Sequence, residues 1–459
     1  PILEWLPKYT LNMFISDLQA GLVVGCMLIP QGMGYADVAG LPYVVGLYSG
    51  FAPLLIYCCT GTSRQMGLGP VAIVSLLVAE GVPACNKLCP LPDGSLPADT
   101  WPSCNADCKG AVYNPAYWQY ATCIAMMSGM IQVVFGPLLG FVMNFVPHPV
   151  ISGFTSAGGL IIAMSQLKDI MGYKIRKGTL QLGIYDFFAH IENTHGTTCV
   201  MGVIAIIFLY FMRKLGQGKV LFFPKVKVTR KMRIFGKLPW PFIAVILYTG
   251  ITYGLRLNER GVKITGKVPG GLPKFSFPPN FFAAVPKLIS ITIQIVIIGY
   301  LESIAVETKF ATILKYPVRP TQEAIAQGAA NIMGGLTFCY PVVGSFSRSA
   351  TNASYGSQSP MCNFITGIVI MLTLLFLTNL FQFMPLNILA AIVIVAAISL
   401  VDPSEALFLW KSSKKEFALL LITFVLTAFA ALELGIYVSI ALCGAEVLFK
   451  STRPKVAVL

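Results

Sequence analysis

Two short stretches of glycine, proline and small residues precede apolar segments of the chain. The first reads GLGPVA at residues 67–72, and the second reads YPVVGS at residues 340–345. A helix that begins inside an apolar region leaves its first N–H groups unpaired and carries about half a positive charge at that end. Proline suits such a start, because its missing N–H would have no helical partner. Two helix ends of this kind that face each other would form a binding site for an anion.

A lone arginine follows the second stretch. Arg348 stands in SFSRS at residues 345–349, within the first turns of the predicted helix, beside Phe346 and Ser347. Arginine is costly inside a membrane and is usually functional there, and its forked donors suit an oxyanion. Serine hydroxyls can supply further donors, although helix capping explains them equally well. Two alternatives for Arg348 are a position near a membrane interface and a structural ion pair with Glu302.

Glu302 places a carboxyl group within another apolar segment, in GYLES at residues 299–303. Burial disfavours its charged form and a nearby arginine favours it, so this group could bind and release a proton. Arg348 and two helix ends give a charge of about +2, which an ionised Glu302 would reduce to about +1. A protonated Glu302 would leave that field intact for a divalent anion, and a purely structural role is the alternative. Glu307 and Lys309 lie one to two turns further along, where we expect a surface role.

Gln31 and Tyr35 follow Pro30 in the motif PQGMGY. They are four residues apart and therefore lie on one face of a helix that the proline and glycines loosen. Both side chains can donate hydrogen bonds toward the predicted anion site. A kinked, packed helix without substrate contact is the alternative.

The positions of these residues indicate an internal repeat. Pro70 and Pro341 are 271 residues apart, and the same shift carries Gln31 onto Glu302. Transporters often contain inverted repeats, and their substrates bind where short, broken helices meet at the middle of the membrane. The shift therefore predicts that the two broken helices occupy equivalent places in two repeats.

The composition indicates the class of protein that holds these residues. Of the 459 residues, 56% are apolar and 11% are charged, whereas a soluble globular protein carries about 25% charged residues. The apolar residues suffice for roughly 13 membrane crossings of about 20 residues each. This composition excludes a soluble enzyme, a disordered chain and a nucleic-acid-binding domain. The long apolar runs also argue against an outer-membrane barrel, whose strands alternate polar and apolar residues.

The apolar segments predict an all-α polytopic membrane protein with 14 transmembrane segments, arranged as two inverted repeats of seven. We expect the first repeat at residues 1–255, a connecting loop at 256–283 and the second repeat at 284–449. The predicted spans are residues 17–38, 43–60, 66–82, 116–136, 138–168, 197–213, 239–255, 286–311, 321–338, 343–358, 361–383, 386–401, 416–431 and 433–449.

The charges and cysteines between the spans predict the orientation. Residues 213–237 carry nine basic and no acidic side chains, which places this loop and both termini in the cytoplasm and accounts for most of the net charge of +14. The polar loop from about Pro83 to Tyr113 falls on the outer side. Its paired cysteines predict disulfides, and a zinc site is the alternative because the C-x3-C spacing also suits zinc. These candidates are Cys85, Cys89, Cys104 and Cys108.

The sequence contains no arrangement of residues typical of an enzyme. The three histidines, His148, His190 and His195, lack a metal-binding spacing, and no phosphate-binding loop typical of ATPases is present. We therefore expect neither catalysis nor a metal or cofactor. An anion channel stays open as an alternative, because the same site with leaky gates would conduct passively.

Several motifs resemble those of the sulfate permease family, also called the solute carrier 26 family. The resemblance covers essentially the whole chain and is strongest to plant and algal sulfate transporters. The motifs are PQGMGYA at 30–36, AGLP at 39–42, GLY at 46–48, SRQ at 63–65, GPVA at 69–72, LESIA at 301–305 and GSFSRSA at 344–350.

This resemblance implies a fold of seven plus seven spans with core and gate domains, a homodimer and an elevator-type cycle. It places the anion between the starts of the third and tenth helices. The implied substrate-binding residues are Gln31, Tyr35, Val71, Ala72, Phe346, Ser347 and Arg348, and Glu302 matches the glutamate that couples transport to protons.

The resemblance also implies the biological setting. We expect import of sulfate with protons across a plasma membrane, with membrane lipids as neighbours and no nucleic-acid partner. Family members continue into a cytoplasmic STAS domain that helps dimerisation, and residues 450–459 resemble the linker toward it. Alternatives on the same fold are an exchanger of chloride, bicarbonate or oxalate, an anion channel, and a voltage-responsive protein similar to prestin.

Overall fold

The structure is a computed structural model. It describes residues 1–81, 115–142, 148–173, 180–216, 238–278, 281–317, 319–398 and 403–430, with a few further positions between 232 and 442. Most of the basic segment and of the last predicted span lie outside the described residues. So do the four cysteines predicted to bind one another or zinc, Cys85, Cys89, Cys104 and Cys108.

The described residues form helices and one short antiparallel sheet of two strands. In chain order the elements are α1 (Ile2–Trp5), η1 (Leu6–Lys8), α2 (Leu11–Ala39), α3 (Tyr43–Ser49), α4 (Ala52–Thr60), β1 (Leu68–Gly69), α5 (Ala72–Gly81), α6 (Pro115–Val142), α7 (His148–Met171), α8 (Leu180–Ala189), η4 (Ile191–Asn193), α9 (Gly196–Gly216), α11 (Trp240–Gly254), α12 (Phe281–Leu314), α13 (Pro320–Leu336), β2 (Val343–Gly344), α14 (Phe346–Ser354), α15 (Met361–Leu372), η5 (Thr373–Leu377), η6 (Thr378–Phe383), α16 (Leu386–Ile398), α17 (Pro403–Ser412) and α18 (Lys414–Phe429).

The helical character agrees with the sequence prediction. Within the described residues, seven helical stretches are long and apolar enough to cross a membrane. Each predicted span from 17–38 to 416–431 overlaps a helix. Two of these helices, α5 and α14, start several residues later than predicted, because the residues before them are extended and pair as β1 and β2. With nine residues, α14 is too short to cross a bilayer by itself.

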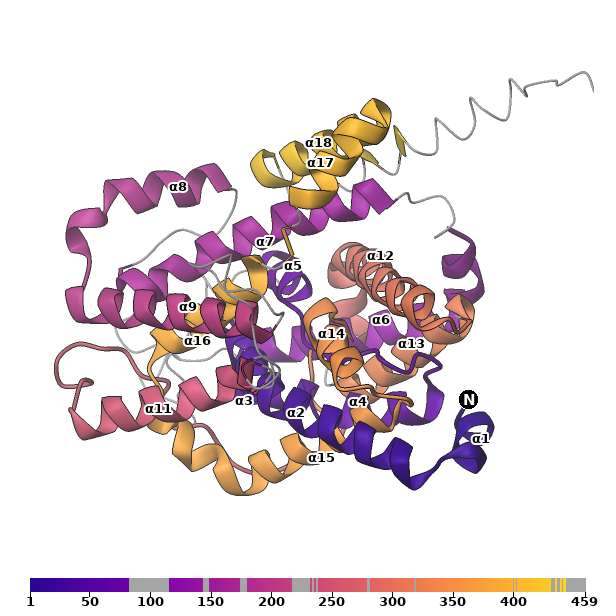
Figure 1. The fold of residues 1–459 in the computed structure, drawn as a ribbon, viewed down its shortest axis with the longest axis horizontal. Coiled ribbons are helices and arrows are strands. Elements are labelled where there is room, and N and C mark those ends of the chain that lie inside the picture. Colours follow the sequence, from indigo (N-terminus) through magenta and orange to yellow (C-terminus); the bar gives the residue numbers. More distant parts are fainter. Residues whose placement is uncertain are drawn as a thin grey trace, which may run out of the picture.

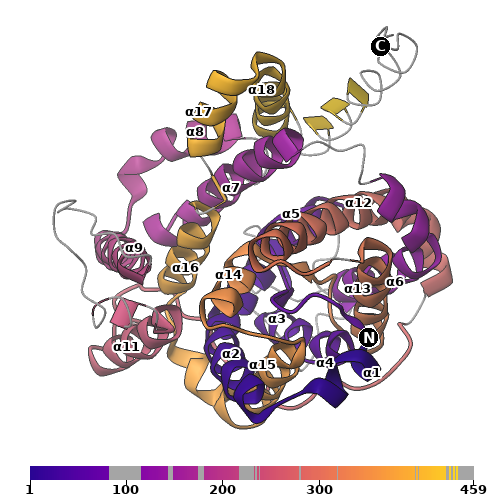
Figure 2. The same ribbon diagram turned by 45° about the vertical axis from the view of Figure 1, so that its right-hand side comes forward.

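The helices pack into two groups (Figures 1 and 2). One group contains α2–α6 and α12–α15 with the sheet between them, and we call it the site group. The other contains α7, α8, α9, α11 and α16–α18, and we call it the flanking group. Each group therefore combines helices from the first and the second half of the chain.

The two groups meet along α2, α5 and α12. Helices α11 and α16 pack against α2, and α7 packs against α5 and α12. One ion pair crosses this contact, because the ammonium of Lys168 in α7 lies 3.1 Å from the carboxylate of Asp37 in α2. Lys168 also lies 3.5 Å from Asp169, its neighbour in the chain.

Local sequence explains where α2 begins and ends. The Thr10 side chain caps its N-terminus by accepting a hydrogen bond from the Met13 N–H at 3.4 Å. Gly40 ends the helix with a φ of 72°, a left-handed conformation that favours glycine. Pro30 lies inside α2 and lacks the N–H of a regular helical hydrogen bond. The helix therefore has a local weak point directly before Gln31.

A buried aspartate joins α2 to the turn between α14 and α15. Asp17 accepts hydrogen bonds from the Tyr9 hydroxyl at 2.9 Å and the Gln358 N–H at 2.8 Å. It also accepts from the hydroxyls of Ser357 at 3.1 Å and Ser359 at 2.5 Å. These donors come from two separate segments, Tyr9 and the turn at residues 357–359, so the aspartate ties both of them to α2.

We expect Asp17→Ala to destabilise the protein strongly. The change removes the shared acceptor of Tyr9, Gln358 and Ser359, and hydrogen bonds to a charged group contribute about 1.5–3 kcal/mol each. The apparent melting temperature in detergent should fall clearly, whereas Glu192→Ala, at an exposed position, should leave it almost unchanged. Equal melting temperatures for the two variants would contradict the stabilising role of Asp17.

Candidate anion-binding site

The two broken helix starts lie side by side and are joined by the short sheet. Leu68 pairs with Gly344 and Gly69 pairs with Val343, in antiparallel register. The Ser345 N–H donates to the Gly67 carbonyl at 3.1 Å, just beyond the paired residues. Because the strands are antiparallel, α5 and α14 leave the sheet in opposite directions, with their N-termini toward each other. The arrangement predicted from the two Gly/Pro stretches is therefore present.

Both helix starts leave backbone donors outside the helical hydrogen-bond pattern. The first helical hydrogen bond of α5 runs from the Ser75 N–H to the Val71 carbonyl, at 3.0 Å. In α14 the first one runs from the Ser349 N–H to the Ser345 carbonyl, also at 3.0 Å. The N–H groups of the preceding helical residues therefore have no partner within their own helix. Together with the two helix dipoles, these donors favour an anion between the helix starts.

Arg348 connects the two helix starts. Its side chain is fully buried in the first turn of α14. Its Nε donates to the Gly67 carbonyl at 3.3 Å and its Nη1 to the Pro70 carbonyl at 2.8 Å. The third guanidinium nitrogen, Nη2, is buried without a hydrogen-bond partner. Arg348 therefore holds the start of α5 with two nitrogens, and its third nitrogen, Nη2, is left for a ligand.

The burial of Arg348 decides between the alternatives from sequence. An arginine that extends to water at a membrane interface would be exposed, so that interpretation is wrong. Among the ion pairs of the described residues, none joins Arg348 to Glu302 within 4.0 Å. Glu302 nevertheless lies close enough to Arg348 to act on it electrostatically when ionised. Arg348 thus keeps its positive charge without a contacting carboxylate.

Two glycines before α5 make room for Arg348. A Cβ atom added at Gly67 would lie 2.5 Å from the Cβ of Arg348, closer than real side chains approach. At Gly69 the φ of 141° disfavours any side chain, and an added Cβ would lie 3.3 Å from the free Nη2 of Arg348. The GLG part of the first motif is therefore required by the close approach of α14.

The other predicted binding residues lie around this centre. Gln31 and Tyr35 are buried in α2, which packs against α5 and α14, and the Oε1 atom of Gln31 is buried without a partner. At the helix starts, Val71 and Ala72 are buried, whereas Phe346 and Ser347 are half-buried. The structure thus brings all seven predicted positions into one region, on α2 and at the starts of α5 and α14.

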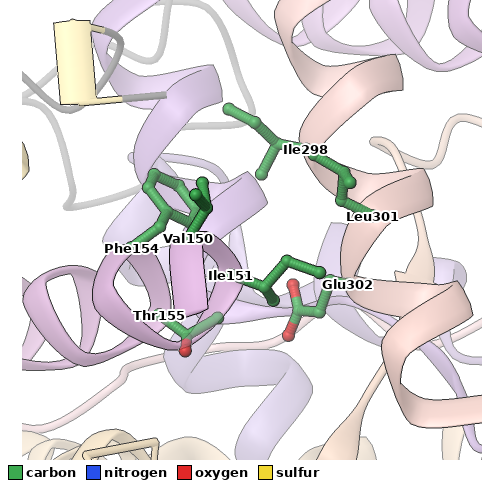
Figure 3. A pocket seen from close by; sticks show the side chains of 7 residues that line it. All are labelled: Val150, Ile151, Phe154, Thr155, Ile298, Leu301 and Glu302. Carbon is green, nitrogen blue, oxygen red and sulfur yellow. The ribbon is translucent and has the colours of Figure 1, made fainter. Parts of the chain in front are cut away.

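Glu302 points from α12 toward α7, at the contact between the two groups (Figure 3). Its side chain is 3% exposed, and its Oε2 atom is buried without a hydrogen-bond partner. It lines a narrow pocket that is otherwise almost entirely apolar, with Val150, Ile151, Phe154, Thr155, Ile298 and Leu301. A charged carboxylate in such a place is poorly stabilised, whereas a protonated one fits.

Three polar side chains support the helix starts, and the sequence analysis assigns no role to two of them, Ser303 and Asn363. Ser303 accepts a hydrogen bond from the Gly344 N–H at 2.9 Å, so it fixes β2 to α12 beside Glu302. Ser349 accepts from the Gly67 N–H at 2.8 Å. Asn363 donates to the Met66 carbonyl at 2.7 Å and accepts from the Leu68 N–H at 3.3 Å. In the sequence, Ser303 and Asn363 are marked only as small polar side chains inside apolar segments.

Arg213 corrects the predicted start of the basic loop. This residue belongs to α9, which continues to Gly216, and its Nη1 donates to the Val395 carbonyl of α16 at 2.9 Å. Arg213 therefore joins two helices of the flanking group. No group of three or more metal-binding side chains occurs in the parts of the chain that the structure describes.

Comparisons with known proteins agree with the geometry. Residues 14–423 match the sulfate permease family. The chain is 35% identical over its whole length to sulfate transporter 4.1, chloroplastic, of Arabidopsis thaliana, and covers 62% of that protein. It is 33% identical to sulfate transporter 1.3 of the same plant, again over its whole length, and covers 66% of it. The chain thus spans somewhat less than two thirds of these relatives.

Solved structures show the same fold. The murine solute carrier 26 family member A9, an anion transporter in the inward-facing state, superposes with a TM-score of 0.80 at 26% identity, over 98% of this chain and 71% of that one. The transmembrane domain of the cyanobacterial bicarbonate transporter BicA superposes with a TM-score of 0.70 at 17% identity, over 95% and 98% of the two chains. The protein is a multi-pass membrane protein, and its chain belongs to the sulfate permease family.

Proposed function

We propose that this protein is a secondary active transporter that imports sulfate together with protons, rather than an enzyme. The observation that carries the proposal is the pair of helix starts joined by a sheet, with the buried Arg348 between them. Sulfate is a divalent oxyanion, and this centre offers it backbone N–H groups, a free guanidinium nitrogen and the Ser347 hydroxyl. The sulfate transporters among its relatives support this choice of anion.

We further propose a layout of 14 spans in two inverted repeats, at residues 1–255 and 284–449, with the loop 256–283 between them. The site group would be the moving core and the flanking group the gate of an elevator-type cycle. Support comes from the way each group combines helices from both halves of the chain. Cytoplasmic termini, a plasma-membrane location, a homodimer and a STAS domain after residues 450–459 belong to the same proposal.

Glu302 would carry the coupled proton. Its carboxyl lies at the contact between the groups, close enough to Arg348 to act on its charge but without an ion pair. A proton on Glu302 leaves the positive field of Arg348 and the helix ends intact for sulfate. Loss of this proton weakens that field, so binding of sulfate and of the proton support each other.

The test is uptake of labelled sulfate into liposomes, with and without an inward proton gradient. One proton moving down one pH unit supplies about 1.4 kcal/mol, which corresponds to about tenfold accumulation. We expect the gradient to drive accumulation by the wild type and by the exposed control Glu259→Gln, whereas Glu302→Gln should lose this drive and keep sulfate–sulfate counterflow. Uptake that ignores pH but needs an anion inside the vesicle would instead show an exchanger.

A second candidate is anion exchange through the same centre, with Glu302 as a structural residue. The observation that favours it is the full-length likeness to the murine member A9 anion transporter. The same uptake experiment separates the two, since only an exchanger requires an anion on the opposite side. A channel would give current without saturation at low substrate concentration.

A further inference from the structure

A second pair of acidic residues is buried in the site group, away from the anion site. Glu307 in α12 is 1% exposed and Glu323 in α13 is 2% exposed. Their carboxyl groups lie within hydrogen-bonding range of each other. The expected surface role of Glu307 is therefore wrong, because α13 covers this side of α12. Lys309 is exposed, as expected, and lies over the ring of Phe346.

Donors from the end of α4 and the residues that follow surround the Glu323 carboxylate. Its Oε1 atom accepts from the Thr62 N–H at 2.5 Å and the Ser63 N–H at 2.8 Å, and the Thr62 hydroxyl donates to the same atom. Its Oε2 atom accepts from the Tyr57 hydroxyl at 2.8 Å. Three of these four donors bind Oε1, which leaves room on Oε2 for one donor more.

Glu307 has no such donors. Both of its carboxyl oxygens are buried, and neither accepts a hydrogen bond from an N–H or O–H group. The ionisable side chains that face the pair are the hydroxyls of Tyr57 in α4, Tyr300 in α12 and Tyr316 after α12. Among the ion pairs of the described residues, none involves either glutamate. Two ionised carboxylates this close would repel each other without a cation between them.

We propose that Glu307 and Glu323 bind one proton between them, as a second proton site distinct from Glu302. Glu307 carries the proton and donates it to Oε2 of Glu323, whose carboxyl oxygens already accept from four other donors. This arrangement satisfies the buried carboxyl of Glu307, which otherwise lacks any partner. The site goes beyond the proposed function, since it binds a proton whether or not Glu302 couples transport.

Polar groups connect this pair to the surface. The hydroxyl of Ser63, whose N–H binds Glu323, lies 3.2 Å from the Tyr316 hydroxyl. Tyr316 is half-buried, and its ring lies 5.2 Å from the guanidinium carbon of the exposed Arg64. Gln327 lies one turn beyond Glu323 in α13. Its Nε2 atom is buried and has no hydrogen-bond partner. A proton on the pair can therefore exchange with water through the hydroxyls near Tyr316.

The experiment is infrared spectroscopy of the purified full chain in lipid, titrated in pH and compared with variants. Wild type should show the carbonyl band of a protonated buried carboxyl at neutral pH. Glu307→Gln should lack one such band, because glutamine still donates to Glu323 but carries no acid proton. Glu302→Gln should retain this band, which separates the pair from the proposed coupling site. Glu307→Leu gives the same readout if the glutamine variant does not fold.

Two results would overturn the proposal. Identical bands in wild type and Glu307→Gln would show that the pair holds no proton. Loss of the wild-type band on addition of sodium would show that a cation, rather than a proton, occupies the site. Failure of Glu302→Gln to alter proton-driven sulfate uptake would contradict the proposed coupling while leaving this site intact.

Discussion

Arg348→Gln is expected to lower sulfate uptake by at least about 100-fold. The change removes the positive charge that is buried between the two helix starts, together with the Nη2 donor that lacks a partner. Hydrogen bonds to a charged group contribute about 1.5–3 kcal/mol each, and 1.4 kcal/mol is a factor of ten in binding. Initial rates of uptake into liposomes measure the loss.

Two control variants distinguish the effect of the positive charge of Arg348 from the effect of its forked guanidinium. Arg348→Lys keeps a positive charge but lacks the fork that reaches both Gly67 and Pro70, so an intermediate rate is expected. Arg319→Gln removes an arginine that is 57% exposed and paired with Glu4, and should transport normally. Normal uptake by Arg348→Gln would exclude this residue from the anion site. Melting temperatures of all three variants show whether a loss reflects misfolding.

Gly67→Ala is expected to destabilise the protein and abolish transport. The added Cβ would lie 2.5 Å from the Cβ of Arg348 and 3.1 Å from its backbone carbonyl carbon, so α5 and α14 must separate. Overpacking of this kind costs about 1–3 kcal/mol, and it also moves the guanidinium away from its two carbonyl partners. Uptake should therefore fall further than the loss of folded protein explains.

Gly250→Ala provides the matched comparison. Gly250 lies within α11, and an added Cβ would meet no atom within 4 Å. Alanine is favoured over glycine inside a helix by about 1 kcal/mol, so this variant should melt at the same temperature or higher. Thermal melting followed by size-exclusion chromatography measures both variants. A Gly67→Ala protein as stable and active as Gly250→Ala would contradict the close packing of the two helix starts.

The sequence predicts the helices well but not their neighbours. Uninterrupted apolar runs, such as the one that forms α16, predict helices because few other structures satisfy the backbone in a membrane. Such helices are apolar on nearly every side, so their pattern does not tell which side faces lipid and which faces protein. The division into the site group and the flanking group therefore depends on contacts between distant segments, such as Asp17 with Ser359.

The sequence indicates which residues form the candidate site, but it does not indicate which hydrogen bonds they make. Glycine and proline at both helix starts, and a lone arginine in an apolar setting, each have a physical meaning that sequence alone conveys. The partners of Arg348 are backbone carbonyls, which every sequence contains, so no pattern identifies them. Glu307 was misplaced because an acidic residue near a helix end has the same spacing whether water or Glu323 lies beside it.

The sheet between β1 and β2 has a thermodynamic consequence. The two halves of the anion site are hydrogen-bonded to each other and belong to one helix group. In the proposed elevator-type cycle, such a centre moves as one body and presents the same donors to an anion on either side. A carrier that binds this anion alone can only bring it to electrochemical equilibrium across a membrane, whatever its affinity on each side. Any concentrative work must therefore come from a second ion whose binding is linked to that of the anion.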